Sequence, residues 1–279
     1  MTIANVVLND FTRDNRVLKV ARSLQGLQHD VTVVALSGPG LPDRAKDSSG
    51  FSVHRVHCQS NQLPRGLFFG LIKFTELALR IVWRFRKVDA WHCNDIEAFV
   101  LGLIAKALNP KLKLVYDCHE FESERNGKSN VEKWIVGRLE RRFIRFAAHV
   151  FLVSPSILRA YQTRYGTYGL PSVSLLRNVP HANPSGEVPE RRLRASLGLP
   201  SDSFVAIYQG AFTYNRGIEQ MLTMAGQMKS DQVDIVFMGY GPLEKSIQKV
   251  ASALPWVHFH PAVDYEDVTR FSADADVGL

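Results

Sequence analysis

The stretch Phe204–Met228, FVAIYQGAFTYNRGIEQMLTMAGQM, decides the fold of the second half of the chain. Residues 204–208 are apolar and strand-favouring, which predicts a buried strand that Gly210 ends. From Arg216 onward the apolar residues recur at helical spacing, which predicts a helix. This order places bare backbone N–H groups beside Arg216 at one sheet edge, where a phosphate can bind. The same unit is also compatible with a tight connection and a solvated arginine.

Length, net charge and cysteine content narrow the class of protein to which the chain can belong. Its 279 residues favour two domains, and its net charge of +7 favours anionic partners such as phosphates, nucleic acid or a lipid surface. Three cysteines without paired spacing argue against a disulfide framework and indicate a reducing compartment, which we expect to be the cytoplasm. The N-terminus lacks a signal-peptide pattern, and no apolar run reaches the roughly 18 residues of a membrane-spanning helix.

Strands and helices alternate along the first part of the chain. The expected strands are residues 3–8, 31–36, 51–56, 90–93, 112–118, 150–153 and 173–176, and the expected helices are 14–27, 67–86, 96–108, 131–148 and 155–165. Residues 37–50 are expected to form a loop. Short links between alternating elements predict right-handed βαβ units, and hence an α/β fold with a doubly wound parallel sheet.

A change of composition predicts the domain boundary. Residues 180–189, PHANPSGEVP, hold three prolines and a glycine, so we expect a linker between a domain at 1–180 and a domain at 181–279. After it the alternation restarts, with expected strands at 204–208, 233–238, 257–260 and 275–279 and expected helices at 190–197, 216–228, 243–254 and 265–272. The last strand has no closing helix after it, so we expect the second domain to be incomplete, as in a C-terminally truncated chain.

Polar side chains follow three of the expected strands. Arg13 and Asp14 come after the first, His92-Cys93-Asn94-Asp95 ends another, and Asp117-Cys118-His119-Glu120 ends the next. Such ends meet at one edge of a parallel sheet, where ligands bind. A histidine beside a carboxylate can orient a group, accept a proton or bind a sugar hydroxyl. The alternative is that both histidines are partly buried and hydrogen-bonded to backbone.

A zinc site is another interpretation of the same two strand ends. It would use His92, Cys93, Cys118 and His119. Successive side chains of a strand point to opposite faces, so both members of each pair cannot easily reach one ion. We therefore expect no metal.

Two segments combine apolar and basic residues. Residues 65–87 and 133–145 are expected helices with several Lys and Arg side chains, which is typical of a surface that attracts anionic lipid. The alternative is a pair of sheet-covering helices whose charges are solvated. Nucleic acid is not expected, because the basic residues do not interleave with aromatics on exposed strands and no reading-helix motif occurs.

Six segments together resemble one enzyme family. They are DNRVLKVARSLQGLQHDVTVVAL (14–36), VYDCHE (115–120), VFLVSPSILRAYQTRYG (150–166), VSLLRNVP (173–180), YQGAFTYNRGIEQML (208–222) and FMGYGPLEKSI (237–247). In order and spacing they resemble the retaining glycosyltransferases of the GT-B fold, the group 1 or family 4 type that uses nucleotide sugars. VYDCHE resembles the "YDxHE" signature of a branch often tied to surface polysaccharide assembly.

The resemblance implies two Rossmann-like domains, with the acceptor on the first and the nucleotide sugar on the second. It implies no metal and no cofactor, since the nucleotide sugar is a substrate, and it implies retention of configuration with help from the leaving phosphate. His119 would lie beside the transferred sugar as the catalytic residue. The donor would be bound by Gly210, Arg216, Gly239 and Gly241, and the glycan or lipid-linked acceptor by Arg13, Asp14, Asn94, Asp95 and Glu120.

Two alternatives stay open at this point. The chain could be a non-catalytic remnant that binds a partner or a membrane, or a GT-B epimerase of nucleotide sugars. The segments YDCHE and RNVP favour the transferase over the epimerase. We expect a cytoplasmic protein, with peripheral attachment at the inner membrane face through residues 65–87 and 133–145.

Overall fold

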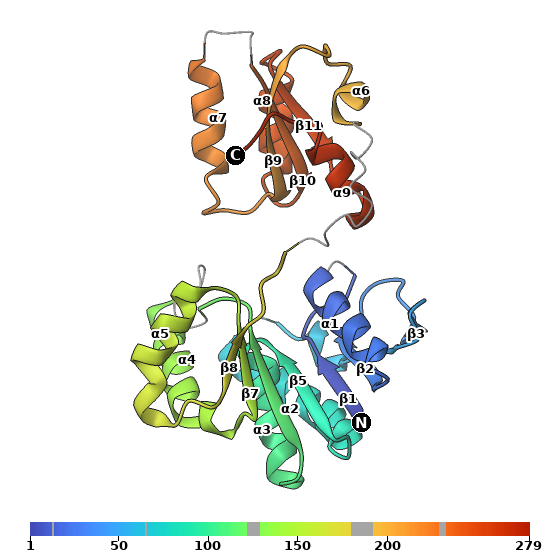
Figure 1. Ribbon diagram of the computed structural model, residues 1–279, viewed down its shortest axis with the longest axis vertical. Coiled ribbons are helices and arrows are strands. Elements are labelled where there is room, and N and C mark those ends of the chain that lie inside the picture. Colours follow the sequence, from blue (N-terminus) through green and yellow to red (C-terminus); the bar gives the residue numbers. More distant parts are fainter. Residues whose placement is uncertain (13, 65, 122–128, 180–191, 229–232) are drawn as a thin grey trace. The chain divides into compact units, whose positions relative to one another are not determined.

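The computed structural model describes residues 1–279 except 13, 65, 122–128, 180–191 and 229–232. The chain divides into two compact units, Met1–Pro180 and His181–Leu279. Each unit has its own sheet (Figure 1). Each also has its own apolar core. Both are α/β structures with mostly parallel sheets, which confirms the predicted fold class.

The first unit contains one sheet with helices on both faces. Its strands are β1 (Thr2–Val6), β2 (Asp30–Leu36), β3 (Arg44–Lys46), β4 (Ser52–Val56), β5 (Ala90–Asn94), β6 (Lys113–Cys118), β7 (His149–Leu152) and β8 (Val173–Leu175). Its α-helices are α1 (Asn15–Gly26), α2 (Leu67–Phe85), α3 (Asp95–Leu108), α4 (Asn130–Phe143) and α5 (Pro155–Tyr165). Single-turn helices are η1 (Gln59–Gln62), η3 (Ile144–Phe146) and η4 (Gly166–Tyr168).

The strand order in this sheet is β3-β4-β2-β1-β5-β6-β7-β8, parallel except for the β3–β4 pair. Strand side chains alternate between two apolar clusters, as the period of two requires. One cluster lies under α1, and the other lies under α2, α3, α4 and α5. The sheet is therefore doubly wound, and β1, β5 and β6 lie side by side in its centre.

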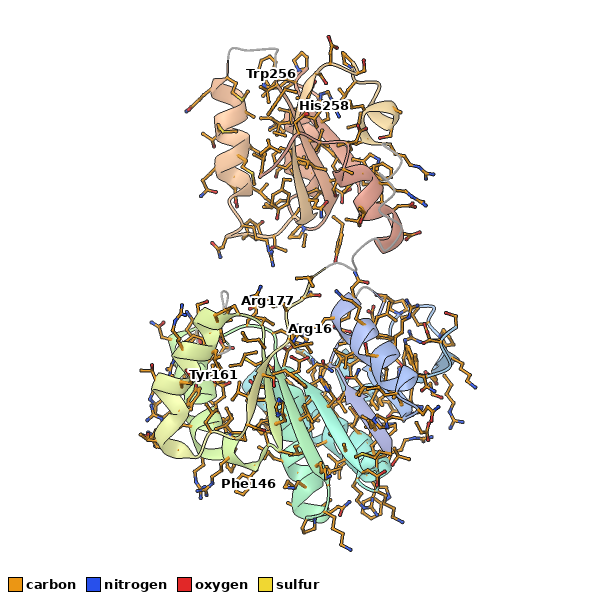
Figure 2. All side chains as sticks on the ribbon, in the orientation of Figure 1. Arg16, Phe146, Tyr161, Arg177, Trp256 and His258 are labelled. Atoms are coloured by element: carbon orange, nitrogen blue, oxygen red, sulfur yellow. The ribbon has the colours of Figure 1, made fainter. Side chains whose placement is uncertain are left out.

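A buried carboxylate ties α4 and α5 to this sheet. Glu140 of α4 is fully buried and accepts hydrogen bonds from the hydroxyls of Tyr116, Tyr161 and Tyr165, at 2.9, 2.5 and 2.8 Å. Burial raises the pKa of Glu140 above its ordinary value, and the three hydroxyl donors oppose that shift. Tyr161, labelled in Figure 2, also contacts Cys118 Sγ at 2.9 Å. The carboxylate that α4 buries against the sheet is therefore satisfied by hydrogen bonds.

Two predictions about the first unit are wrong in detail. The expected loop at 37–50 contains β3, a strand of three residues whose two charged side chains give no alternating pattern. A short charged strand at a sheet edge discourages pairing with other chains. The helix expected over 131–148 ends at Phe143, and the single turn η3 follows it.

The second unit contains a smaller parallel sheet. Its strands are β9 (Phe204–Ala211), β10 (Val233–Tyr240), β11 (Val257–Pro261) and β12 (Val277–Gly278), in the order β11-β10-β9-β12. Its helices are α6 (Leu193–Leu197), α7 (Ile218–Gln227), α8 (Glu244–Ala251) and α9 (Tyr265–Ser272). One apolar cluster packs under α7 and α8, and another under α6 and α9.

Gly210 does not end its strand, contrary to the prediction. β9 continues to Ala211 and β10 to Tyr240, and Gly210 is paired with Gly239 in the ladder between them. The two glycines have φ angles of 142° and 159°, which side chains rarely allow. At these two positions the glycines adopt an unusual backbone conformation, and the pairing of β9 with β10 continues through them.

Candidate active site

The carboxyl ends of β1, β5 and β6 bring five polar side chains together. We call this the strand-end cluster. It consists of Arg16 from α1, His92 from β5, Asp95 at the start of α3, Asp117 from β6, and His119 just after β6. The cluster lies at the sheet edge where parallel α/β sheets bind ligands.

An ion pair between Arg16 and Asp117 is the centre of the cluster. The guanidinium donates to both carboxylate oxygens, from Nε to Oδ2 at 3.1 Å and from Nη2 to Oδ1 at 2.5 Å, and Nη1 donates to the Leu176 carbonyl at 2.8 Å. The side chains of Arg16 and Asp117 are 6% and 0% exposed. Burial would raise the pKa of Asp117, but the neighbouring His119, His92 and Arg16 side chains hold it far below its usual range. Asp117 is therefore ionised.

His119 lies between two carboxylates. Its Nδ1 is 3.5 Å from Asp95 Oδ1, and its Nε2 is 3.6 Å from Asp117 Oδ2. Burial would lower the pKa of this imidazole, but Asp117 and Asp95 outweigh that effect and raise it above its ordinary value. Its Nε2 is buried without a hydrogen-bond partner among the described residues. The arrangement favours an imidazolium that can donate a hydrogen bond to a ligand.

Asp95 has an unusual backbone at this point. Its φ angle is 72°, in the left-handed region, although it is the first residue of α3. Such a conformation costs about 1–3 kcal/mol for a residue other than glycine and often occurs at functional sites. The turn brings the Asp95 carboxylate to the His119 ring.

The second unit offers a different kind of site, made mostly of backbone. Three glycines with positive φ lie at this edge of the sheet: Gly210 is the second-to-last residue of β9, Gly239 is the second-to-last residue of β10, and Gly241 follows β10. A Cβ atom on Gly239 would lie 1.9 Å from the Gly210 carbonyl oxygen, and one on Gly241 would lie 2.6 Å from the Phe212 carbonyl oxygen. A Cβ on Gly210 would meet only the Tyr208 hydroxyl, at 3.9 Å. Close packing therefore requires glycine at positions 239 and 241. At position 210 there is room for a side chain, and it is the positive φ angle that favours glycine.

The start of α7 lies after these strand ends. Its N-cap is Gly217, with φ 77°, so no side chain caps the first N–H groups of the helix. Arg216, directly before the cap, is exposed and makes no hydrogen bond or ion pair with any described residue. Uncapped N–H groups, the positive end of the helix dipole and an arginine together form an anion-binding arrangement.

Residues 14–171, more than half of the chain, match the family described as Glycosyl transferase 4-like domain. The chain belongs to this family. This confirms the predicted resemblance to glycosyltransferases, while retention of configuration and the YDxHE branch stay predictions. No curated protein matches the chain in sequence.

Solved structures of low identity share the fold of this glycosyltransferase. Sucrose-phosphate synthase from Thermosynechococcus elongatus is 18% identical with a TM-score of 0.78, and the match covers 100% of this chain and 74% of that one. HepE from Anabaena, solved with UDP-glucose, is 18% identical with a TM-score of 0.69, covering 100% and 73%. WaaB, a lipopolysaccharide outer core galactosyltransferase, is 9% identical with a TM-score of 0.58, again covering 100% and 73%. At these identities the likeness shows the GT-B fold alone.

The other residues that the sequence predicted to bind an acceptor have varied positions. Asn94 is buried, and its amide donates to Asn5 Oδ1 at 2.7 Å and to the Val6 carbonyl at 2.9 Å, so it joins β5 to β1. Asp14 caps α1, accepting from the Val17 N–H at 3.1 Å. Glu120 is exposed beside the cluster. Arg13 lies outside the described residues.

Sequence reasoning missed Arg16 as a member of the site. Its position within a helical period predicts only a helix residue. One signal was present: Arg16 occupies the first turn of α1, where the helix dipole disfavours a cation. A cation in that place needs a partner elsewhere, and Asp117, 101 residues away, provides it.

The His and Cys side chains considered above for a zinc site point in different directions. In the ranges that the structure describes, no three His, Cys, Asp or Glu side chains are grouped as a metal site requires. Cys93 and Cys118 are buried in the apolar cluster under α3 and α5, while His92 points to Asp117.

We predict that Arg16→Gln lowers the free energy of unfolding of the first unit by about 3–5 kcal/mol, because it leaves Asp117 charged and buried. Urea unfolding followed through the tryptophans of the first unit measures the change. The matched control is Arg22→Gln on the same helix, whose ion pair with Asp47 at 3.3 Å is exposed and should contribute about 0–1 kcal/mol. Equal losses in the two variants would contradict the prediction.

We predict that Gly239→Ala destabilises the second unit by about 3 kcal/mol, because its methyl group would overlap backbone rather than a movable side chain. The control is Gly226→Ala in α7, where a Cβ meets nothing within 4 Å and should add about 0.5–1 kcal/mol of helix stability. Urea unfolding followed at Trp256 reports on this unit. An unchanged midpoint for Gly239→Ala would show that the two strands can separate at low cost.

Proposed function

We propose that this glycosyltransferase moves a sugar from a nucleotide-sugar donor to a polysaccharide or lipid-linked acceptor, with retention of configuration. The observation that carries the proposal is the anion-binding arrangement of the second unit: Arg216, the uncapped start of α7, and the glycines in the last residues of β9 and β10 and just after β10. A nucleotide sugar presents a diphosphate to such a surface. HepE, which shares the fold, was solved with UDP-glucose, and this supports the same donor class here.

The donor diphosphate gains negative charge as its bond to the sugar breaks. Arg216 and the first N–H groups of α7 stabilise that charge, and the backbone N–H groups are fixed before the reaction begins. The glycines at 210, 239 and 241 present backbone in place of side chains toward the nucleotide. The leaving phosphate oxygen takes the proton of the acceptor hydroxyl as that hydroxyl attacks the same face of the sugar.

The first unit holds the acceptor and the transferred sugar. His119 donates a hydrogen bond from Nε2, its buried atom without a partner among the described residues, to a hydroxyl of the sugar. Asp117 and Asp95 keep the imidazole charged and oriented. Arg13, Asp14, Asn94, Asp95 and Glu120 make up the acceptor side, with Asn94 acting from within the sheet.

Attachment to an anionic membrane surface belongs to the same proposal. Residues 65–87 include α2, which exposes Phe68, Leu71, Leu79 and Trp83, and residues 133–145 include the basic part of α4. An apolar stripe flanked by arginines suits the headgroup region of a bilayer. Within the described residues, no helix has the length and apolarity needed to cross a membrane. The three free cysteines suit a reducing compartment, so we propose a cytoplasmic location at the inner membrane face.

Donor binding provides the first test. We predict that one class of nucleoside diphosphate or nucleotide sugar raises the melting temperature, with about 2.7 kcal/mol of added stability at 100 times Kd. Arg216→Ala should weaken that binding by about 1.5–3 kcal/mol, because a charge-assisted contact is lost. The control, Lys249→Ala on the exposed side of α8, removes the same charge and should leave affinity unchanged. Undiminished affinity in Arg216→Ala would place the donor elsewhere.

Turnover provides the second test. We predict that His119→Ala lowers sugar transfer far more than donor affinity, by about 100-fold or more, since the imidazolium acts on the reacting sugar. The control is His149→Ala, at the opposite end of β7 from the strand-end cluster, which should retain transfer. Full activity of His119→Ala would remove His119 from the reaction.

The same assays separate the alternatives. A non-catalytic remnant binds the donor class and transfers no sugar in the wild type. An epimerase converts the nucleotide sugar into an isomer without any acceptor.

A further inference from the structure

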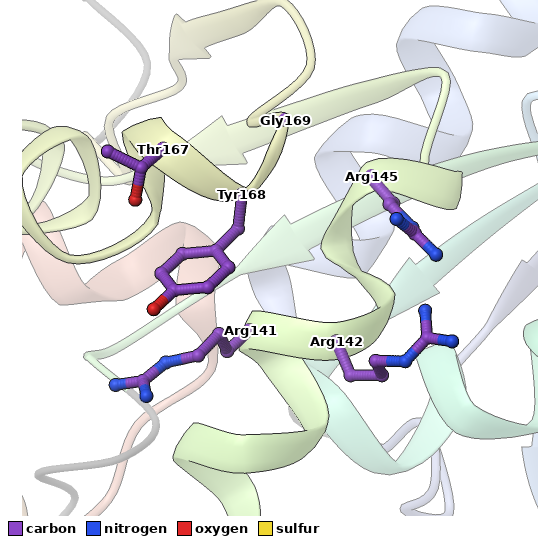
Figure 3. Close-up of a pocket in the computed structure, with 6 residues that line it drawn as sticks. All are labelled: Arg141, Arg142, Arg145, Thr167, Tyr168 and Gly169. Atoms are coloured by element: carbon purple, nitrogen blue, oxygen red, sulfur yellow. The ribbon is translucent and has the colours of Figure 1, made fainter.

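A pocket of about 500 Å³ lies at the end of α4, apart from the strand-end cluster (Figure 3). We call it the α4-end pocket. It is lined by Arg141 and Arg142 of α4, Arg145 of η3, and Thr167, Tyr168 and Gly169 in and after η4. Arg141 lies beside Tyr168, with its guanidinium carbon 5.1 Å from the ring centroid.

Arg141, Arg142 and Arg145 of this pocket make no ion pair with a carboxylate in the part of the chain that the structure describes. Between residues 129 and 169, Lys and Arg outnumber Asp and Glu by seven to two. The two acidic residues are engaged elsewhere: Glu132 in the capping box of α4, and Glu140 with the buried tyrosines. The positive charge of the pocket is therefore available to a ligand.

The side chains define the class of ligand. Guanidinium groups bind phosphate oxygens through paired hydrogen bonds, and the hydroxyls of Thr167 and Tyr168 add further donors. The end of α4 contributes about half a negative charge, which three full positive charges exceed. A phosphate group fits this chemistry better than a carboxylate because it offers more oxygens to three separate donors.

The surroundings indicate that the phosphate belongs to a lipid. Trp134, Arg138 and Arg141 follow one another at helical spacing and share one face of α4. Trp134 is 62% exposed, and Phe146, next to Arg145, is 40% exposed. Arg138 lies 5.0 Å from the Trp134 ring centroid. Exposed aromatic rings beside arginines that have no carboxylate partner among the described residues suit the headgroup boundary of a bilayer, where the rings lie near the acyl chains and the cations near the phosphates.

We propose that the α4-end pocket binds the phosphate headgroup of an anionic lipid, while Trp134 and Phe146 enter the boundary of the bilayer. This rests on the proposed membrane attachment and gives it a specific lipid-binding site. The pocket would fix the first unit to the membrane at one point. A general attraction of basic residues to anionic lipid would not fix any single point.

Vesicle binding by the full chain tests the proposal. The probe is vesicles of phosphatidylcholine containing about one-third phosphatidylglycerol, measured by co-sedimentation. The triple variant Arg141→Gln/Arg142→Gln/Arg145→Gln should weaken binding on the order of 100-fold, since each basic residue near the surface contributes separately. The control, Arg44→Gln/Lys245→Gln/Lys249→Gln, removes the same charge from exposed positions elsewhere and should change binding by about threefold or less.

A second variant distinguishes a pocket from diffuse charge. Arg141→Lys/Arg142→Lys/Arg145→Lys keeps the charge but loses the paired donors, so binding should fall by about tenfold. Wild-type affinity in this variant, or equal losses in the glutamine triple and its control, would overturn the pocket while leaving membrane attachment intact. If the wild type does not bind the vesicles at all, both the attachment and the pocket assignment fail.

Inorganic phosphate tests the source of the phosphate group. We expect no thermal stabilisation at millimolar phosphate, because a single free ion lacks the contacts that the bilayer adds at Trp134 and Phe146. Strong stabilisation of the wild type but not of the glutamine triple, with vesicle binding equal in both, would assign the pocket to a soluble phosphate and overturn the lipid proposal. Fluorescence of Trp134 should shift to shorter wavelength on vesicle binding, and Trp134→Phe should lose that part of the shift.

Discussion

The buried ion pair of Arg16 and Asp117 is the constraint on which the first unit depends. Neither charge is stable inside a protein alone, so each fixes the position of the other. The pair joins α1 to β6 and, through the Leu176 carbonyl, to the end of β8. Because Asp117 is ionised there, both His92 and His119 have an anion within reach. The charge and orientation of His119 thus follow from a contact made by another residue.

The two candidate sites are built by different physical means. The first uses charged side chains that hold one another in place across three strand ends. The second uses the absence of side chains: Gly239 and Gly241 allow β9, β10 and the following turn to approach closely, and an uncapped helix begins nearby. Side-chain networks suit varied sugar hydroxyls, whereas backbone N–H groups and a helix end suit a diphosphate.

The sequence predicted the classes of elements well, and their ends less well. Periods of two and of three to four residues locate almost all the strands and helices, because burial on a sheet face or a helix face depends on spacing alone. Residues 44–46 gave no period, so β3 was missed. Gly210 was expected to end a strand because glycine usually does. Only the pairing with Gly239 explains why β9 continues.

By its order of residues, the sequence determined the α/β alternation, the polar groups at the strand ends, and the family resemblance. The tertiary structure alone decided which charges meet. Arg16 and Asp117 are 101 residues apart, and no local pattern links them. The partners of two neighbouring residues of α4 were likewise decided by the fold. Glu140 accepts hydrogen bonds from three tyrosines of other elements, and Arg141 lies beside Tyr168 at the surface. Spacing along a chain fixes the face on which a residue lies, but a partner across the fold fixes its charge and its role.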